Sequence, residues 1–215
     1  MTRQAHGERE VVLLGAGGHA RVVADAWRAA GGGPIAGVVV ADGHGDAAWR
    51  PSGRSWRRGD SWLIGQDPAR FLLLLGVGLV PGRRLRLELA ARYRAAGFRF
   101  ATVRHPAAIL AEDAVLEEGA QVMAGAVLQT GVRVGPDAVV NTGAIVDHDC
   151  VIGAGAHIAP GAVLCGAARV GEAAFVGAGA VVLPGTAIGA GALVPAGCVV
   201  RADVPAGARA ALTGG

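Results

Sequence analysis

Residues 127–170 read VLQTGVRVGPDAVVNTGAIVDHDCVIGAGAHIAPGAVLCGAARV, and this stretch repeats one pattern every six residues. An aliphatic residue fills every sixth position, with Gly, Asp or Ala three residues after it and a small residue four after it. The aliphatic positions continue on both sides, in sixteen consecutive hexads from Leu110 to Val200. Gly and Asp tolerate the backbone angles of a tight corner. The period therefore predicts a solenoid with three six-residue faces per coil, its parallel strands about 4.8 Å apart.

Outward side chains of the predicted coils fall into three columns, because the residue before each aliphatic position returns to the same face every eighteen residues. The first column is wholly apolar and reads Val127, Ile145, Val163, Val181 and Val199. The second reads Val115, Arg133, Val151, Arg169 and Ala187, and the third reads Gln121, Val139, His157, Phe175 and Leu193. Soluble monomers rarely leave an apolar stripe in water. We therefore expect two of the three edges to be buried against other subunits.

The first half of the chain predicts one βαβ unit. Residues 11–14 form an apolar strand, residues 15–19 a glycine-rich turn, and a helix with apolar periodicity extends to Gly31, followed by a strand over 35–40. The turn has the G-x-G-x-x-A spacing of nucleotide-binding units, with the acidic residue Asp42 about twenty residues beyond it. About 100 residues precede the coils, which is room for one mononucleotide-binding half but not for a complete dinucleotide domain.

Composition argues against several classes of protein. All 20 basic residues are arginine, and the net charge of +3 is too small and too scattered to indicate nucleic-acid binding. The three cysteines have no metal-type spacing and indicate small buried hydrophobes in a reducing compartment. Charged residues crowd the chain start where a signal peptide would be apolar, and the apolar run 71–80 is too short to span a bilayer. We expect a cytoplasmic protein with no membrane insertion.

Residues 105–204 resemble the hexapeptide-repeat family, and the whole chain resembles its sialic-acid O-acetyltransferase and bacillosamine N-acetyltransferase group. The resemblance implies an α/β plus all-β fold, in which a short Rossmann-like domain over 10–104 precedes a left-handed parallel β-helix over 105–204. Residues 1–9 are expected to be disordered, and residues 205–215 form a C-terminal tail. The resemblance also implies a homotrimer and acetyl-CoA as co-substrate.

The stretch from Asn141 to Asp149 contains the best candidate for catalysis. His148 lies in an outward part of its hexad, between Asp147 and Asp149, and Asn141 is the only asparagine of the chain. Acyl transfer needs a base that titrates near neutral pH, and a carboxylate beside a histidine orients the ring and stabilises the imidazolium. The family motif of His followed by Glu or Asp implies that His148 is the general base and Asp149 its partner. Asn141 is the third catalytic candidate.

Most ligand-binding residues follow from the resemblance position by position. It implies that acetyl-CoA contacts His157, Ala178 and Ala196, and Gly166 is expected to join them because its bare backbone lets the coenzyme approach closely. A nucleotide-linked sugar is expected to contact Gly17, Gly18, His19, Asp42 and Gly65. Without the resemblance, His19 is equally a histidine that caps its own helix. Residues 43–62, rich in Trp and Arg, are expected to form a surface loop, with a flap that stacks on a base or sugar as the alternative.

The expected function is acetyl transfer from acetyl-CoA to an amino or hydroxyl group of a nucleotide-linked sugar. The alternatives are a catalytically inactive trimeric scaffold that binds nucleotide sugar, and an acetyltransferase for a non-nucleotide acceptor such as sialic acid. No metal is expected, because His105 lies more than two coils before His148 and His157, so the three cannot converge on one zinc within a subunit. The alternative left open is a zinc held by histidines across a subunit interface, as in the γ-class carbonic anhydrases, which also have a left-handed β-helix. The tail lacks the final Gly-x-Pro-Ala strand that many relatives place against the coenzyme.

Overall fold

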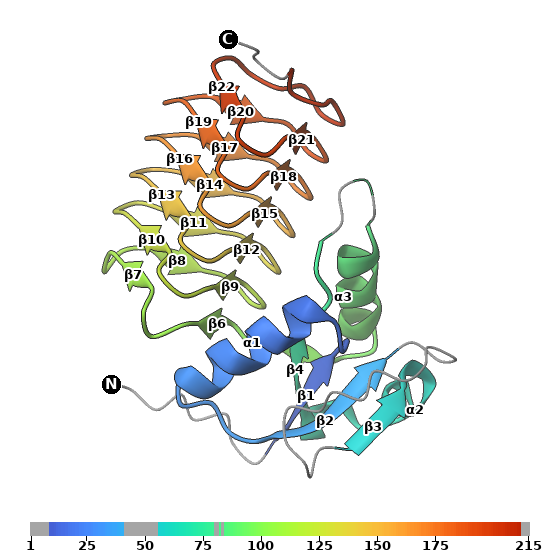
Figure 1. Ribbon diagram of the computed structural model, residues 1–215. Coiled ribbons are helices and arrows are strands. Elements are labelled where there is room, and N and C mark those ends of the chain that lie inside the picture. Colours follow the sequence, from blue (N-terminus) through green and yellow to red (C-terminus); the bar gives the residue numbers. More distant parts are fainter. Residues whose placement is uncertain (1–8, 41–55, 80–81, 83, 212–215) are drawn as a thin grey trace.

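The computed structural model describes residues 9–40, 56–79, 82 and 84–211. In the described part of the chain, an α/β domain lies against one flank of a column of stacked triangular coils (Figure 1). The coils climb from β6 and β7, beside the α/β domain, to β22 at the far end of the column. Helix α1 lies between the α/β sheet and the first coils, and α3 rises beside the column.

The α/β domain is built on one parallel sheet with strand order β3-β2-β1-β4-β5. Its elements are β1 (Glu10–Leu14), α1 (Gly18–Ala29), β2 (Ile35–Val40), β3 (Trp56–Gly59), α2 (Asp60–Ile64), the 3-10 turn η1 (Pro68–Arg70), β4 (Phe71–Leu75), α3 (Leu85–Ala95) and β5 (Arg99–Phe100). Because successive strand residues face opposite sides, Val11 and Leu13 of β1 pack with α1, whereas Val12 and Leu14 pack with the side of α3.

The expectation of a surface loop over 43–62 is wrong for its last residues. Residues 56–59 form strand β3, which pairs with β2, and α2 follows it directly. Trp62 of α2 packs edge-on against Phe71 with ring centres 6.2 Å apart, and the Arg58 guanidinium lies 5.8 Å above the Trp62 ring. The backbone pairing of an edge strand needs no alternation of side chains, which is why the pattern did not reveal it. Residues 43–55 lie outside the described residues.

The coil strands form three parallel sheets, as the six-residue period predicts. The first coil sheet contains β6 (Val103–Arg104), β9 (Gln121–Val122), β12 (Val139–Val140), β15 (His157–Ile158), β18 (Phe175–Val176) and β21 (Leu193–Val194). The second contains β7 (Ile109–Leu110), β10 (Val127–Leu128), β13 (Ile145–Val146), β16 (Val163–Leu164), β19 (Val181–Val182) and β22 (Val199–Val200). The third contains β8 (Val115–Leu116), β11 (Arg133–Val134), β14 (Val151–Ile152), β17 (Arg169–Val170) and β20 (Ala187–Ile188).

Most coil corners use the left-handed backbone region where the pattern places Gly, Asp or Ala, the first and last, at Asp113 and Asp203, being the exceptions. Glycines fill most of these corners, and Asp137, Asp149, Ala167 and Ala173 take the same conformation with φ of 57–59°. The aliphatic and small residues of each hexad pack into one buried core along the column axis. Coil pairing begins at Val103, two residues before the predicted boundary, and isolated bridges extend it to Arg209 inside the predicted tail.

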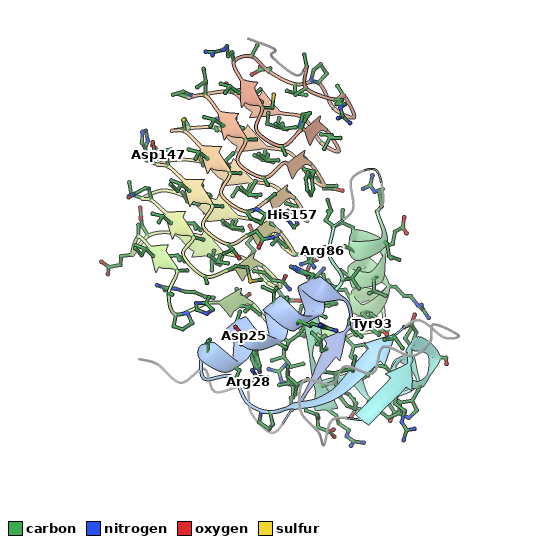
Figure 2. The ribbon with its side chains drawn as sticks, viewed as in Figure 1. Asp25, Arg28, Arg86, Tyr93, Asp147 and His157 are labelled. Carbon is green, nitrogen blue, oxygen red and sulfur yellow. The ribbon has the colours of Figure 1, made fainter. Side chains whose placement is uncertain are left out.

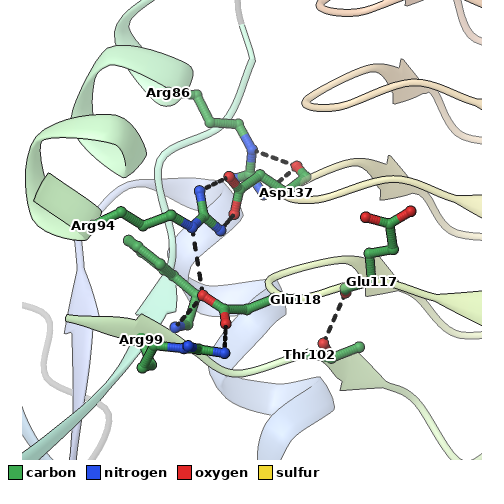
Figure 3. A network of polar contacts seen from close by, with 8 residues as sticks. Arg86, Arg94, Arg99, Thr102, Glu117, Glu118 and Asp137 are labelled. Atoms are coloured by element: carbon green, nitrogen blue, oxygen red, sulfur yellow. Dashed lines mark hydrogen bonds and ion pairs between the residues drawn. The ribbon is translucent and has the colours of Figure 1, made fainter. Parts of the chain in front are cut away.

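An arginine network fastens the α/β domain to the coils (Figure 3). Arg94 of α3 bonds the Asp137 carboxylate, with Nη2 2.9 Å from Oδ1, and also pairs with Glu118. Arg99 pairs with Glu118 at 2.6 Å. The Asp137 side chain is 3 % exposed, so it sits in a low-dielectric contact between the two parts of the chain. This network fixes the α/β domain over the first coil sheet.

Candidate active site

His148 and Asp149 form a hydrogen-bonded pair on the outside of the column. Both lie in the corner that joins β13 of the second coil sheet to β14 of the third. The Nδ1 atom of His148 is 2.9 Å from Oδ2 of Asp149, and the side chains are 55 % and 67 % exposed. Asp149 holds this position through its left-handed backbone, with φ of 59°. The corner therefore presents an imidazole to the exterior with one nitrogen already bonded.

Hydrogen-bond chemistry fixes which nitrogen of His148 is free. An ionised carboxylate only accepts, so Nδ1 carries the proton and Nε2 keeps its lone pair. The hydrogen bond to Asp149, and then the negative charge of Asp147, raise the pKa of His148 above its ordinary value. Both effects favour the imidazolium. This arrangement suits a general base that takes a proton at Nε2.

His157 and Asn141 belong to a different surface, on the first coil sheet under the α/β domain. His157 is 6 % exposed and stacks on Phe175, with ring centres 5.0 Å apart. Its Nε2 is 3.3 Å from Nδ2 of Asn141, whose Oδ1 accepts a bond from the Thr142 amide at 2.8 Å. Burial, and then the charges of His19 and Arg86, lower the pKa of His157 to about 3. A histidine with that pKa is neutral at working pH and cannot act as a proton shuttle there.

His19 joins the glycine turn of the α/β domain to the coils. Its Nε2 donates to Oε1 of Gln121 at 2.9 Å, and Gln121 in turn donates to the Leu75 carbonyl at 2.8 Å. This chain of bonds fixes the neutral tautomer of His19 with the proton on Nε2. Burial, and then the charge of Arg86, lower the pKa of His19 to about 4. The ring centres of His19 and His157 are 6.4 Å apart.

A pocket of about 390 Å³ opens at the carboxyl ends of β1 and β4. The glycine turn before α1, the segment 76–79 that follows β4, and His19, Leu85 and Arg86 line it. The space beside Gly17 and Gly18 is open, since a Cβ at either glycine would meet no atom within 4 Å. The free amides at the start of a helix bind anions such as phosphate. The pocket therefore has the shape and the backbone donors for a phosphate-bearing ligand.

The charge beside this pocket comes from Arg86, which sequence reasoning missed. This residue is 1 % exposed, and its guanidinium donates to the backbone carbonyls of Leu75, Val77 and Asp137. Burial lowers the pKa of Arg86 to about 10, so it remains charged at neutral pH. The carboxylate whose charge acts on Arg86, that of Asp137, is bonded to Arg94. In the sequence Arg86 is one of several arginines near a helix start, which gives no signal of burial.

The structure does not bring His148 to the pocket of its own chain. The pocket domain covers the first coil sheet, where Gln121 and His157 are buried, and His148 sits at the corner between the second and third sheets. In a three-sided column that corner faces away from the first sheet. Figure 2 shows this separation, with Asp147 at the outer edge of the column and His157 beside the α/β domain. The third outward column is thus covered at Gln121 and His157 by its own chain rather than by another subunit.

The other predicted ligand residues are spread over three places. Gly166 lies in the His148 corner, one coil further along, while Ala178 and Ala196 are exposed at the corner between the first and second coil sheets. Gly65 ends α2 and is not among the residues that line the described pocket. Asp42 lies outside the described residues. One chain therefore does not assemble all of these positions into a single site.

The described residues lack both a membrane-spanning helix and a group of metal-binding side chains. They contain no helix with the length and the apolar character that a membrane crossing requires. They also contain no group of three or more His, Cys, Asp or Glu side chains placed to hold a metal ion.

Comparison with known proteins places these observations in a family. The family model of the bacterial transferase hexapeptide, six repeats long, matches residues 167–202. No curated protein sequence matches the chain. Among solved structures, the acetyltransferase domain of PglB from Neisseria gonorrhoeae, in complex with acetyl coenzyme A, is 33 % identical with a TM-score of 0.82. The match covers 94 % of this chain and 96 % of that domain.

Two more structures extend the comparison. PerB from Caulobacter crescentus, in complex with CoA and GDP-perosamine, is 37 % identical with a TM-score of 0.81, over 93 % of this chain and 92 % of that one. WeeI from Acinetobacter baumannii, 21 % identical with a TM-score of 0.78 over 94 % and 95 % of the chains, shares the fold. The expected left-handed β-helix after a short α/β domain is thereby confirmed. The chain belongs to the hexapeptide-repeat acetyltransferase family, together with the PglB acetyltransferase domain and PerB.

Proposed function

We propose that this chain transfers an acetyl group from acetyl-CoA to an amino or hydroxyl group of a nucleotide-linked sugar. The observation that carries the proposal is the His148–Asp149 pair, whose Nε2 is left free as a base on the outside of the column. Similarity over nearly the whole chain to proteins that bind acetyl coenzyme A, or CoA with GDP-perosamine, supports the choice of donor and acceptor.

The proposed reaction is one direct transfer. The nitrogen or oxygen of the acceptor forms a bond to the thioester carbonyl carbon. At the same time Nε2 of His148 accepts the proton that this acceptor atom loses. The carbon–sulfur bond then breaks, and the CoA sulfur leaves with the electron pair and receives the proton from the imidazolium. Asp149 holds the ring in position and stabilises its charged form. No covalent acyl-enzyme is needed, and the inward Cys150, with a pKa raised by burial to about 11, is a poor nucleophile.

The two parts of the chain have separate roles in this proposal. The Rossmann-like domain, over 10–104, holds the nucleotide sugar with its phosphates at the glycine turn, near Gly17, Gly18 and His19. The positive charge of Arg86 beside that turn favours the same anion. The β-helix over 105–204 supplies the base and the groove for acetyl-CoA, with His157, Gly166, Ala178 and Ala196 along it.

The active form in this proposal is a homotrimer with shared sites. Within one chain, the His148 corner faces away from the sheet that carries the pocket domain, so the pocket must receive its base from another copy. The apolar column on the second coil sheet adjoins the His148 corner and leaves Ile109 66 % and Ile145 43 % exposed. Burying that stripe against a neighbour brings His148 to the neighbour's surface.

Thiol release with acetyl-CoA tests the activity, using a panel of UDP-, GDP- and CMP-linked amino sugars and sialic acid. We expect release with one acceptor, and a loss of several orders of magnitude in turnover in His148→Ala. Full turnover in that variant contradicts the proposed base. Release with sialic acid alone supports the non-nucleotide acceptor. Binding of a nucleotide sugar without any release favours the inactive scaffold.

Mixed trimers test whether the sites are shared. His148→Ala removes the base, and Gly17→Trp fills the pocket without a backbone conflict, since φ at Gly17 is −81°. Each variant alone is expected to be inactive. Co-refolded in equal amounts, they should recover roughly a quarter of wild-type activity if base and pocket come from different subunits. No recovery, in trimers that mass spectrometry shows to be mixed, places both parts of the site in one chain.

A further inference from the structure

The imidazole of His148 is fixed by a single hydrogen bond, although it is more than half exposed. Exposed side chains normally sample several rotamers, each separated by little energy. A base must instead be held close to one geometry, because a misplacement of about 1 Å can cost 100-fold in rate. Something besides Asp149 must therefore restrict the ring.

The backbone of the next coil lies directly against this ring. A Cβ added at Gly166 would come within 2.5 Å of Nε2, 2.7 Å of Cε1 and 3.1 Å of Cδ2 of His148. These distances are shorter than van der Waals contact, so any side chain at Gly166 would displace the ring. The imidazole thus rests on the bare backbone of Gly166, with its Nε2 edge over that residue.

Glycine at this position is not required by the backbone. Gly166 has an ordinary φ, whereas the corner glycines take the left-handed region. The other described coil glycines with ordinary φ would bring a Cβ against backbone atoms of the next coil, and they are Gly135, Gly153, Gly171, Gly177 and Gly189. Among the described coil glycines with ordinary φ, only Gly166 would bring a Cβ against a side chain, that of His148. It is also the only glycine among the sixteen residues that stand two after an aliphatic position.

A second glycine lies on the opposite side of the pair. One coil earlier, a Cβ at Gly131 would come within 2.5 Å of Oδ1 of Asp149. Gly131 has a φ of 73°, yet Ala167 and Ala173 take the same region at equivalent corners, so the conformation alone does not demand glycine. Bare backbone therefore flanks Asp149 from the preceding coil and His148 from the following one.

We infer that Gly166 is a positioning residue for His148, and that Gly131 does the same for Asp149. The missing side chain at Gly166 lets the imidazole lie across the next coil with Nδ1 on Asp149 and Nε2 open to the acceptor. A methyl group there pushes the ring away, breaks its bond to Asp149 and misdirects Nε2. The seating of the ring is independent of the reaction, whereas its catalytic consequence rests on the proposed function of His148.

Gly166→Ala tests the inference with two separate readouts. In the acetyl-transfer assay we expect kcat to fall about 100-fold, with KM for acetyl-CoA changed less than about threefold. By NMR on the protein alone, the His148 titration midpoint should move down, because the ring loses the hydrogen bond that raises its pKa. An unchanged kcat with an unchanged midpoint overturns the inference. A raised KM for acetyl-CoA at constant kcat and midpoint also overturns it, and makes Gly166 a coenzyme contact only.

Gly131→Ala and Gly191→Ala form a matched pair for the second glycine. Both introduce a side chain at left-handed φ, 73° and 67°, but a Cβ at Gly191 meets no atom within 4 Å. We expect similar losses of stability, with the His148 signal moved only in Gly131→Ala. Equal effects of the two variants on that signal would remove Gly131 from the inference. Full activity of His148→Ala would end the proposed function while the NMR result for Gly166→Ala still stood.

Discussion

Arg86 donates two hydrogen bonds to the backbone carbonyl of Asp137, from Nε at 3.2 Å and Nη2 at 3.0 Å, across the contact between the α/β domain and the coils. The Asp137 carboxylate is left to Arg94. Asp137 therefore binds two arginines, Arg86 through its backbone carbonyl and Arg94 through its carboxylate. These bonds fix the position of the pocket relative to the first coil sheet.

Arg86→Met should therefore destabilise the chain strongly. It leaves the carbonyls of Val77 and Asp137 without their donor and takes one of two donors from the Leu75 carbonyl, which keeps Gln121, at a cost of about 3–5 kcal/mol in the free energy of unfolding. The control is Arg84→Met, which removes an ion pair to Glu172 between side chains 64 % and 55 % exposed and should cost less than about 0.5 kcal/mol. Denaturant unfolding at matched protein concentration measures both. Similar losses in the two variants would contradict the anchoring role of Arg86.

The rate of acetyl transfer should depend on pH through His148. The base must be neutral, so kcat/KM should fall as pH drops through a midpoint above the ordinary histidine pKa, because Asp149 and Asp147 raise it. Asp149→Asn removes the charge beside Nδ1, so the acid limb should move to lower pH and kcat should fall about 10- to 100-fold. A pH–rate profile of each protein measures this. An acid limb at the same pH in both proteins would rule out Asp149 as the partner.

Stability should decrease in acid because of His157 and His19. Burial lowers their folded-state pKa values to about 3 and 4, so between pH 6.5 and 4 the unfolded chain binds protons that the folded chain does not. Stability is then fully present above pH 6.5 and is lost as pH falls, by up to about 1.4 kcal/mol per unit for His157. Unfolding at a series of pH values should show a smaller slope in His157→Gln. An equal slope would mean that His157 does not contribute.

A strained corner offers a stabilising substitution far from the chemistry. Ala173 has a φ of 57°, which costs an L-residue about 1–2 kcal/mol. Ala173→Gly removes that strain at an unfolded-state entropy cost of about 0.4–1 kcal/mol, so we expect a net gain near 0.5–1 kcal/mol. Ala190→Gly, at an exposed corner residue with ordinary φ, should instead lose about 0.4–1 kcal/mol. Thermal unfolding of both variants gives the sign of each stability change. A loss of stability in Ala173→Gly as well as in Ala190→Gly would refute the strain at Ala173.

Much of the β-helix was predictable because its determinants are local. Each hexad carries its own inward aliphatic residue and its own corner, so Asp149 and Ala173 adopt left-handed φ where the pattern requires it. The His148–Asp149 contact was predictable for the same reason, since neighbours in a tight corner meet without help from distant chain. Strand β3 was missed because four residues of edge strand carry no alternation that a pattern can reveal.

The placement of the site could not be read from the sequence, because it depends on contacts between distant segments. Gln121 is covered by His19 and the α/β domain, and His157 lies between His19 and its column neighbour Phe175. In the sequence Arg86 cannot be told from an exposed arginine, because the carbonyls that bind it come from residues up to 51 positions away. The six-residue period determines which side chains point outward. It does not determine what covers them.

The regular stacking of the coils has a consequence for length. Strands pair with a constant offset of eighteen residues, as Val127 does with Ile145, and each coil adds about 4.8 Å along the axis. Ala178 and Ala196 occupy equivalent positions in successive coils, eighteen residues apart. The Gly197 amide next to Ala196 donates to the Ala178 carbonyl at 2.9 Å. The number of coils therefore sets the length of surface that the column offers to an elongated molecule bound along it. Inserting or deleting one coil would change that length by about 4.8 Å and would keep the same pairing between the remaining coils.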